Sequence, residues 1–228
     1  MAGDRKYVDQ SNLVPTCFKA MSGPIFPPCI LAPVFMSTLD QHPTSTFAVW
    51  ANAFSHSELD MIEAIGDRLT VEKAIVASGA AEGVVRGKIR ITQTAWMEPS
   101  SETKWIYDRV QGVARALNDR VYQFDLRGFS ENLQYSVYHG LEGGHYDWHV
   151  DHGPIRVLRK LSISVQITDP SLYDGCDLQF QGGNRIEIAP RDRGSVIAFP
   201  SYVLHRVTPC THGTRKAIVA WTTGPQLR

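Results

Sequence analysis

The stretch LSISVQIT, residues 161–168, alternates strictly between apolar and polar side chains. Because successive side chains of a strand point to opposite faces, this alternation predicts a β-strand with one apolar and one polar face. The segments around it repeat the theme as short apolar runs separated by turns that contain glycine. The further strands predicted in this half of the chain cover residues 133–139, 146–151, 177–180, 185–188, 195–199, 205–207 and 216–222. About eight short strands of this kind favour a sandwich or barrel, and a jelly-roll barrel is the economical choice because its mouth gathers side chains from distant strands.

Two helices are predicted before this run of strands. The first begins at Ser55, which forms a capping-box pattern with Glu58, and the second begins near residues 100–101, after Pro99. Their apolar residues repeat at helical spacing, at Leu59, Ile62, Ile65 and Leu69 in the first helix and at Ile106, Val110, Val113 and Leu117 in the second. Short strands are expected at residues 46–54 and 87–97. We therefore expect a mainly β fold that is buttressed by two N-terminal helices.

The first 45 residues differ from the rest in their proline content. Proline removes a backbone donor and fixes its own dihedral angle, so this segment predicts an extended arm rather than a helix or a central strand. We assign residues 1–45 to a proline-rich arm and residues 46–228 to one domain. No stretch approaches the ~20 apolar residues of a membrane helix, and the start lacks the apolar core of a signal peptide. The expectation is a soluble, cytoplasmic protein.

Charge and cysteine usage disfavour several classes of protein. The chain carries 23 basic and 23 acidic side chains, so it has no net field that would attract nucleic acid or an anionic membrane. Its four cysteines, Cys17, Cys29, Cys176 and Cys210, are scattered without a Cys-x-x-Cys pair. This spacing indicates neither a zinc cluster nor a disulfide framework, and it suits a reducing compartment.

The string His149-Val150-Asp151 is the strongest candidate for a metal site. On a strand, residues two apart share a face and are separated by ~6.6 Å of backbone rise. His205, from a distant strand, would complete a set of two imidazoles and one carboxylate. Such a set leaves positions open on a non-haem Fe(II) for substrate and oxygen, and it predicts an oxygenase.

A lone His-x-Asp pair is more often solvated or hydrogen-bonded than bound to metal. Here the potential ligands alternate with Tyr146, Trp148 and Val150, which predicts a strand with one apolar face and one face rich in metal-binding groups. His145 and Asp147 share the parity of the first pair, so spacing alone leaves them as a rival pair.

Arg215 is the second element of the predicted site. It shares strand parity with Ala217, Val219 and Trp221, so it should project into the same apolar interior. A buried guanidinium requires a planar anion, and a carboxylate bound through both arms of the fork fits best. A dicarboxylic cosubstrate and an internal salt bridge to Asp or Glu explain this arginine about equally well.

Several motifs together resemble a known family. They are YDWHVD at 146–151, RKLS at 159–162, APR at 189–191 with Gly194, FP at 199–200, LHRVTP at 204–209 and GTR at 213–215. The stretch from Phe47 to Pro225 is similar to the iron(II)- and 2-oxoglutarate-dependent dioxygenases of the prolyl 4-hydroxylase type, particularly their bacterial and phage branch. The resemblance implies a double-stranded β-helix that holds Fe(II) through His149, Asp151 and His205, and it favours this pair over the rival one.

The resemblance also implies a cosubstrate pocket. Arg215 would bind the distal carboxylate of 2-oxoglutarate, Tyr138 would lie near the cosubstrate, and Trp221 would line the same pocket. Both aromatic residues can also be read as core residues, and for Trp221 the two readings explain the residue about equally well. Ser162 and Gln166, on the polar face of their strand, could reach the cosubstrate.

The activity that follows from this resemblance is hydroxylation of an unactivated C–H bond, with O2 and 2-oxoglutarate consumed and succinate and CO2 released. Ascorbate is a further cofactor that the resemblance suggests. Proline within a peptide is the first substrate candidate, and a free amino acid or another small metabolite is the second. A catalytically idle β-barrel that serves as a binding module is a different class of explanation. A nucleic-acid demethylase with the same cofactors is disfavoured by the neutral charge, and the sequence leaves the oligomeric state open.

Overall fold

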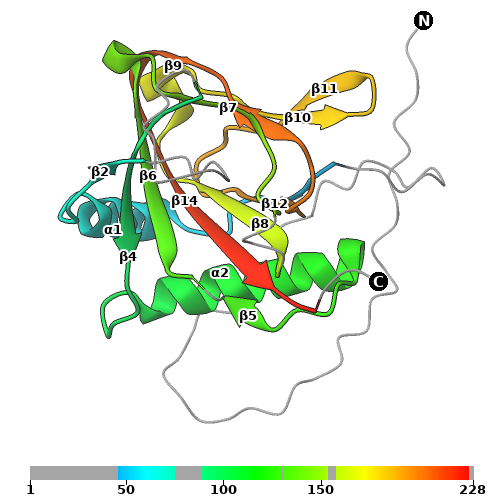
Figure 1. Cartoon of the computed structure of the whole chain (residues 1–228). Coiled ribbons are helices and arrows are strands. Elements are labelled where there is room, and N and C mark those ends of the chain that lie inside the picture. The colour runs from blue at the N-terminus through cyan, green and yellow to red at the C-terminus, as the bar shows by residue number, and fades with distance from the viewer. Residues whose placement is uncertain (1–45, 75–88, 130, 154–157, 226–228) are drawn as a thin grey trace, which may run out of the picture. The chain divides into compact units, whose positions relative to one another are not determined.

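A computed structural model describes residues 46–74, 89–129, 131–153 and 158–225 (Figure 1). The predicted arm, residues 1–45, lies outside these ranges. The helical elements are α1 (His56–Gly66), α2 (Lys104–Leu117), a π-helical turn (Asn118–Tyr122) and two 3-10 turns (Gly140–Glu142 and Pro170–Leu172). The strands are β1 (Ala48–Trp50), β2 (Glu72–Lys73), β3 (Arg90–Ile91), β4 (Gln93–Met97), β5 (Gly128–Phe129), β6 (Leu133–His139), β7 (His145–His149), β8 (Arg159–Gln166), β9 (Tyr173–Gly175), β10 (Leu178–Gly182), β11 (Arg185–Ile188), β12 (Val196–Pro200), β13 (His205–Val207) and β14 (Cys210–Thr223).

The strands form two antiparallel sheets. The larger has the order β1-β12-β8-β14-β6-β4-β2, with β5 and β9 also paired to β14, and the smaller has the order β11-β10-β13-β7-β3. Neighbours in these sheets are often distant in sequence, as with β8 and β12 or β7 and β13. The fold is therefore mainly β, and strands far apart in the chain lie side by side, as the predicted gathering of distant ligands requires.

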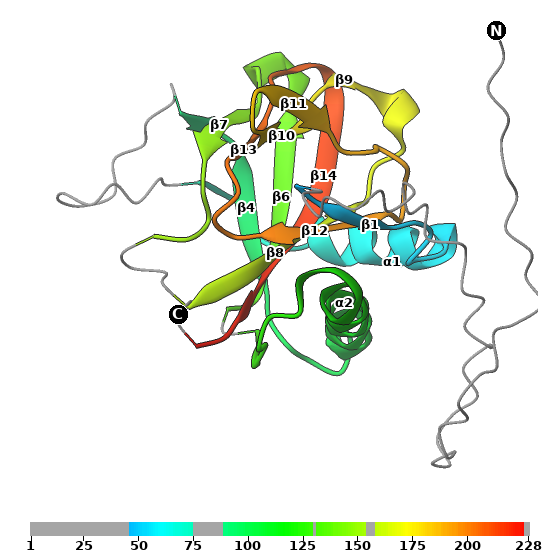
Figure 2. The same ribbon diagram turned by 90° about the vertical axis from the view of Figure 1, so that its right-hand side faces the viewer.

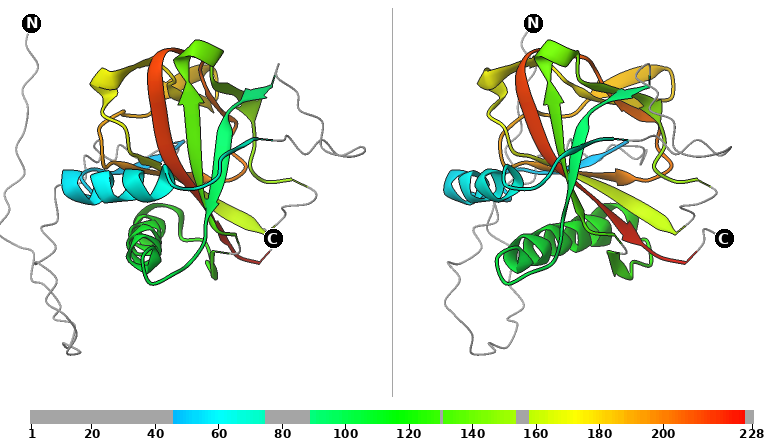
Figure 3. Two further views of the ribbon diagram at one scale, coloured as in Figure 1. Left: turned by 90° about the vertical axis from the view of Figure 1, so that its left-hand side faces the viewer. Right: turned by 60° about the vertical axis from the view of Figure 1, so that its left-hand side comes forward.

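The two faces of the larger sheet have different neighbours. One face packs on the helices, because Leu161, Ile163 and Val165 of β8 join the apolar residues of α1 and α2 in one buried cluster. The second cluster contains Phe180 and Val207, which lie on strands of the smaller sheet, together with Tyr138 and Phe199 of the larger sheet. The helices thus lie on one side of β8 and β14, and the β10–β11 hairpin lies on the other (Figures 2 and 3). Such an arrangement leaves the polar face of β8 turned toward the smaller sheet.

β14 positions several predicted site residues through its register. It pairs with β6 on one side and β8 on the other, with Arg215 opposite Tyr138 and Trp221 opposite Ser162. The strand was predicted to span residues 216–222, but it runs for 14 residues from Cys210 to Thr223. Glycine at position 213, with φ of 67°, lies inside this longer strand and was not expected there.

The helices begin and end differently from the prediction in two places. The hydroxyl of Ser55 and the side chain of Glu58 form the expected capping box, but α1 ends at Gly66, before Leu69. α2 begins at Lys104 rather than near residue 100. The preceding residues form a turn in which the Thr103 hydroxyl donates to the Glu98 carbonyl at 2.6 Å and accepts from the Ser100 N–H. Neither helix in the described ranges is long and apolar enough to cross a membrane.

Candidate metal centre

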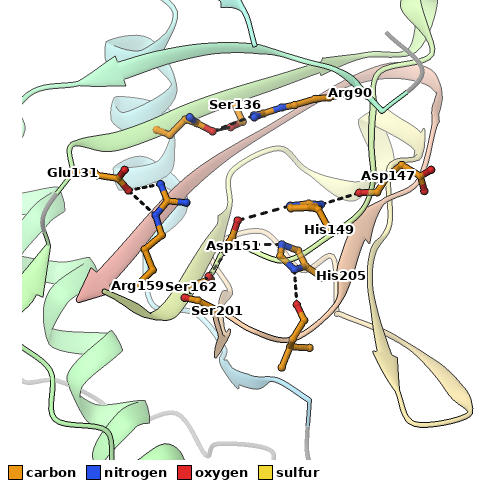
Figure 4. A network of polar contacts seen from close by, with 12 residues as sticks. Arg90, Glu131, Ser136, Asp147, His149, Asp151, Arg159, Ser162, Ser201 and His205 are labelled. Carbon is orange, nitrogen blue, oxygen red and sulfur yellow. Dashed lines mark hydrogen bonds and ion pairs between the residues drawn. The ribbon is translucent and has the colours of Figure 1, made fainter. Parts of the chain in front are cut away.

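Three potential metal ligands meet between β7 and β13. His149 is the last residue of β7, Asp151 follows two residues later, and His205 is the first residue of β13. Their candidate ligand atoms all lie within 4.8 Å of one another (Figure 4). Nε2 of His149 lies 3.8 Å from Oδ1 of Asp151, and Nε2 of His205 lies 3.6 Å from Oδ2. This is the set of two imidazoles and one carboxylate that the sequence predicts.

The backbone explains why these side chains converge. His149 and His205 are direct partners in the β7–β13 pair, and their rings lie 4.1 Å apart. Asp151 lies just beyond the strand, where its N–H donates to the carbonyl of Ser201 at 2.9 Å. This bond ties the end of β7 to the segment that follows β12, so the carboxylate is directed back toward both imidazoles.

Hydrogen bonds orient each of the three groups. Nδ1 of His149 lies 2.8 Å from the carbonyl of Asp147, and Nδ1 of His205 lies 2.9 Å from that of Val203. A carbonyl can only accept, so each Nδ1 donates its proton to the carbonyl and each Nε2 is left to face the cluster. The hydroxyl of Ser162 donates to Oδ2 of Asp151 at 2.7 Å. These hydrogen bonds therefore hold the three side chains with their candidate ligand atoms turned toward one another.

The electrostatic environment sets suitable protonation states. Burial, together with the nearby His205, lowers the pKa of His149 to about 3. Burial alone would raise the pKa of Asp151, but His205 and His149 outweigh it and lower that pKa to about 2. At neutral pH His149 is thus neutral and Asp151 is ionised, which are the forms that bind a divalent cation.

The strand that carries the site does not alternate as predicted. It ends at His149, and its register with β13 shifts between the two paired positions. As a result, the ring of Tyr146, which was expected on the opposite face, stacks on His149 with ring centroids 3.4 Å apart. The prediction of a uniform face from position 145 to 151 was wrong because a strand irregularity cannot be read from periodicity.

The rival pair does not converge. Nδ1 of His145 lies 2.8 Å from the carbonyl of Gly143, and the exposed side chain of Asp147 accepts from the N–H of Trp148. Across the described ranges, His149, Asp151 and His205 form the one cluster of three or more such residues that could hold a metal ion.

Arg215 shares a pocket with these three residues. The pocket has a volume of about 670 Å³, and Tyr138, Val219 and Trp221 also line it. Arg215 is 2% exposed and donates to Oε1 of Gln166 from Nη2 at 2.9 Å and from Nε at 3.3 Å. Among the described residues, no Asp or Glu forms an ion pair with it. The internal salt bridge considered from the sequence is therefore not found in this part of the chain.

The other predicted pocket residues take different positions. Tyr138 is 4% exposed, and the Arg215 guanidinium lies 5.4 Å from its ring centre. The guanidinium of Arg159 lies 3.7 Å from the ring centre of Trp221. The indole N–H of Trp221 faces the carboxylate of Asp151, but the contact does not have the geometry of a hydrogen bond. Ser162 contacts Asp151 and Gln166 contacts Arg215, so these two side chains support predicted ligand-binding residues.

Sequence reasoning missed two arginines of this pocket, Arg90 and Arg159. Arg90 lies on β3, which pairs with β7 so that Arg90 is opposite Tyr146. That pairing joins segments about 55 residues apart, and a two-residue strand carries no periodic signal that could reveal it. Arg159 was quoted within a motif, but its ion pair with Glu131 and its stacking on Trp221 depend on the fold.

Comparison with known proteins was consistent with this geometry. The 2OG-Fe(II) oxygenase superfamily matches residues 133–223. A PKHD-type hydroxylase of Pseudomonas putida strain F1 is 31% identical over 122 residues, which cover 48% of this chain and 54% of that protein. A PKHD-type hydroxylase of Hyphomonas neptunium is 35% identical over 85 residues, which cover 35% of this chain and 38% of that protein. The chain thus spans about half the length, or less, of these curated relatives.

Solved structures show the same fold. A Pseudomonas putida prolyl-4-hydroxylase has a TM-score of 0.64 and 17% identity, over 80% of this chain and 94% of that one. A prolyl hydroxylase from Trichoplax adhaerens, in complex with a peptide fragment of hypoxia inducible factor, has a TM-score of 0.63 and 17% identity, over 79% of this chain and 84% of that one. The matched stretch, residues 133–223, contains His149, Asp151, His205 and Arg215, so the part of this chain that holds the candidate site is similar to the 2OG-Fe(II) oxygenase superfamily.

Proposed function

We propose that this chain is an Fe(II)- and 2-oxoglutarate-dependent dioxygenase that hydroxylates an unactivated C–H bond. His149, Asp151 and His205 would hold the iron, and Arg215 would bind the distal carboxylate of 2-oxoglutarate. The observation that carries the proposal is the meeting of this ligand cluster and a buried arginine in one pocket. When bound, iron and 2-oxoglutarate supply the oxidative chemistry, in which the cosubstrate becomes succinate and CO2.

The ligand set fits Fe(II) in number and in chemistry. Two neutral imidazole nitrogens and one carboxylate oxygen on one side of the ion leave the other side for cosubstrate, substrate and oxygen. The Ser162 hydroxyl holds the carboxylate, and the carbonyls of Asp147 and Val203 hold the imidazoles. These contacts would position the metal by orienting its three ligands.

Arg215 fits an anionic cosubstrate. The guanidinium of Arg215 is 2% exposed and hydrogen-bonded to a neutral amide, and no acidic side chain among the described residues pairs with it. A carboxylate bound through both arms of the fork would satisfy it. Gln166 would fix the fork, and Tyr138 would form a wall beside it.

We extend the proposal to the finer architecture. The two antiparallel sheets would form a double-stranded β-helix, or jelly-roll barrel, with the pocket between them. The dioxygenase domain would span residues 46–228 because α1, α2 and β1 share one buried core with β8 and β14.

The substrate would be proline within a peptide. The support for it is the fold shared with proteins named prolyl hydroxylases, one of them solved with a peptide. A free amino acid or another small metabolite is the alternative, because an amino acid would bring a carboxylate of its own to Arg90, which lines the pocket.

Succinate production tests the proposal. We expect the native chain to convert 2-oxoglutarate to succinate with Fe(II) under air, and His149→Ala to lose this turnover. His145→Ala is the matched control, because this neighbouring imidazole faces the carbonyl of Gly143 rather than the cluster. A rise in turnover with a proline-rich peptide would support the peptidyl-proline substrate, whereas indifference to the peptide would favour a small molecule.

A metal titration distinguishes the enzyme from an idle binding module. We expect one Fe(II), or one Mn(II) as a stand-in, to bind per chain with a dependence on His149 and Asp151. An absence of both stoichiometric uptake and succinate would contradict the dioxygenase proposal and leave a β-barrel that binds other ligands.

A further inference from the structure

A second arginine, Arg90, faces the pocket, and the part of the chain that the structure describes supplies no acidic partner for it. Arg90 lines the same pocket as His149 and Arg215. Its Nη2 donates to Oε1 of Gln134 at 3.1 Å, while its buried Nε makes no hydrogen bond to any described residue. Within the ranges that the structure describes, no carboxylate forms an ion pair with Arg90. A partly buried guanidinium with only neutral partners is a site where an anion is stabilised.

Aromatic packing holds Arg90 in place. Its guanidinium lies 4.5 Å from the ring centre of Tyr146, and the Tyr146 ring in turn stacks on His149. The hydrogen bond to Gln134 fixes the other side, and the hydroxyl of Ser136 donates to the same amide oxygen (Figure 4). Arg90 is therefore oriented before any ligand arrives, which lowers the entropic cost of binding.

The position of Arg90 suits contact with a substrate at the metal. Its guanidinium lies over the ring of Tyr146, and that ring stacks on the imidazole of His149, so Arg90 borders the cluster. It lies on β3 of the smaller sheet, whereas Arg215 lies on β14 of the larger sheet. Two arginines thus approach one pocket from different sheets, and only one of them is needed for the distal carboxylate of 2-oxoglutarate.

The charge balance of the loaded pocket points to an anion. Arg159 is neutralised by its ion pair with Glu131, and the exposed Glu72 and Lys73 at the mouth have opposite signs. With Fe(II) and doubly charged 2-oxoglutarate bound, the remaining groups are Asp151, Arg215 and Arg90, and one positive charge is left over. Arg90 carries that excess, because Arg215 is paired with the cosubstrate.

We propose that Arg90 binds a carboxylate of the substrate, so that this pocket acts on an acid. The inference rests on the proposed function, since it assigns the substrate class of the same site. The carboxylate belongs either to the amino acid that is hydroxylated or to an acidic residue beside it in a peptide. Arg90 is a residue that determines specificity and takes no part in proton or oxygen transfer.

Binding to the protein loaded with Mn(II) and 2-oxoglutarate tests the inference by calorimetry. One arm compares N-acetyl-L-proline with N-acetyl-L-prolinamide, which differ only in the carboxylate. The other arm compares an acetylated and amidated Pro-Asp dipeptide with its Pro-Asn counterpart. We expect the acid to bind about tenfold or more tightly than its neutral counterpart in one arm, as for a charge-assisted hydrogen bond. The arm that shows this preference identifies the source of the carboxylate.

Two variants assign the preference to Arg90. Arg90→Gln should bind the acid and the amide of each pair equally, with unchanged affinity for 2-oxoglutarate. Arg206→Gln is the matched control, because Arg206 also stacks on an aromatic ring, that of Trp148 at 4.6 Å, and donates to the glutamine Gln179, but lies outside the pocket lining. It should keep the preference of the native chain. If Arg90 had only a structural role, Arg90→Gln would lower the affinity for the acid and for the amide by the same factor.

Several results would overturn the inference. Equal binding of acid and amide by the native chain in both arms would do so, as would a preference that survives in Arg90→Gln. A fall in 2-oxoglutarate affinity in Arg90→Gln, with the acid preference intact, would instead assign Arg90 to the cosubstrate. A native chain that binds neither Mn(II) nor 2-oxoglutarate contradicts the proposed function itself, and it is recognised before any substrate probe is added.

Discussion

The hydroxyl of Ser162 donates a 2.7 Å hydrogen bond to Oδ2 of Asp151 and lies 3.0 Å from the hydroxyl of Ser201. Ser162 lies on β8, opposite Trp221 of β14. A central strand of the larger sheet thus holds the carboxylate of Asp151, which faces the two imidazoles of the smaller sheet. The candidate metal cluster therefore depends on both sheets, although its two imidazoles come from the smaller one alone.

Ser162→Ala should weaken metal binding without removing a ligand. Loss of this hydrogen bond leaves Asp151 less well oriented, and such supporting contacts contribute about 10-fold or more to metal affinity. The measurement is a titration with Mn(II). Ser164→Ala is the control, because Ser164 lines the same pocket but makes no hydrogen bond to Asp151 within the described residues. Equal affinities for the two variants would contradict the role given to Ser162.

The sequence predicted this site better than it predicted the strand that carries it. His149, Asp151 and His205 were found because metal-ligating residue types are rare in such an arrangement, and their convergence does not depend on perfect alternation. Tyr146 was placed on the wrong face, since the register shift between β7 and β13 is a tertiary feature. Strands such as β6, β11 and β13 have the predicted bounds because turns flank them closely.

The supporting residues were less accessible to prediction. The polar parity of Ser162 and Gln166 on β8 was correctly read, and these side chains contact Asp151 and Arg215. Their contact with a cosubstrate stays a prediction. The position of a residue along a strand predicts the face on which its side chain lies. The residue that it contacts depends on which element packs against that face, and the sequence pattern does not give this. Arg90 was missed for the same reason, because β3 becomes part of the site only through its pairing with β7.

Gly213→Ala should destabilise the protein strongly. Gly213 has φ of 67°, and an added Cβ would lie 1.9 Å from the carbonyl oxygen of Leu172, so the backbone of β14 must shift. Gly143→Ala is the matched control, because Gly143 has φ of 62° but open space around the added Cβ. We expect a loss of about 1 kcal/mol in the free energy of unfolding for the control and clearly more for Gly213→Ala, measured in urea. Equal losses would show that the close approach to Leu172 costs nothing.

Cys176 should resist alkylation in the folded protein. It is 1% exposed, and burial raises the pKa of its thiol to about 12. Because the thiolate is the nucleophile, the folded chain should react with iodoacetamide at this position far more slowly at pH 8 than the chain unfolded in urea. Mass spectrometry of the peptide that contains Cys176 measures both rates. Similar rates in the two states would show that the second buried cluster opens readily.

Glu58 should contribute stability that disappears in acid. Burial would raise the pKa of Glu58, but the Ser55 N–H and the Arg109 guanidinium, at 2.8 and 2.9 Å, outweigh it and lower that pKa below 4.5. As the pH falls, Glu58 therefore takes up its proton at a higher pH in the unfolded chain than in the folded one. The stabilisation by the ionised carboxylate is present above pH 4.5 and is lost below it. Glu58→Gln should cost no more than about 1 kcal/mol at pH 7, because solvent screens this partly exposed group, and less at pH 3. Urea unfolding at both pH values measures this difference.

Glu102→Gln is the control. It breaks an ion pair with Arg68 in which the side chains are 60% and 59% exposed, so it should change stability little at either pH. A cost for Glu58→Gln that does not depend on pH would assign the role of Glu58 to hydrogen bonding alone.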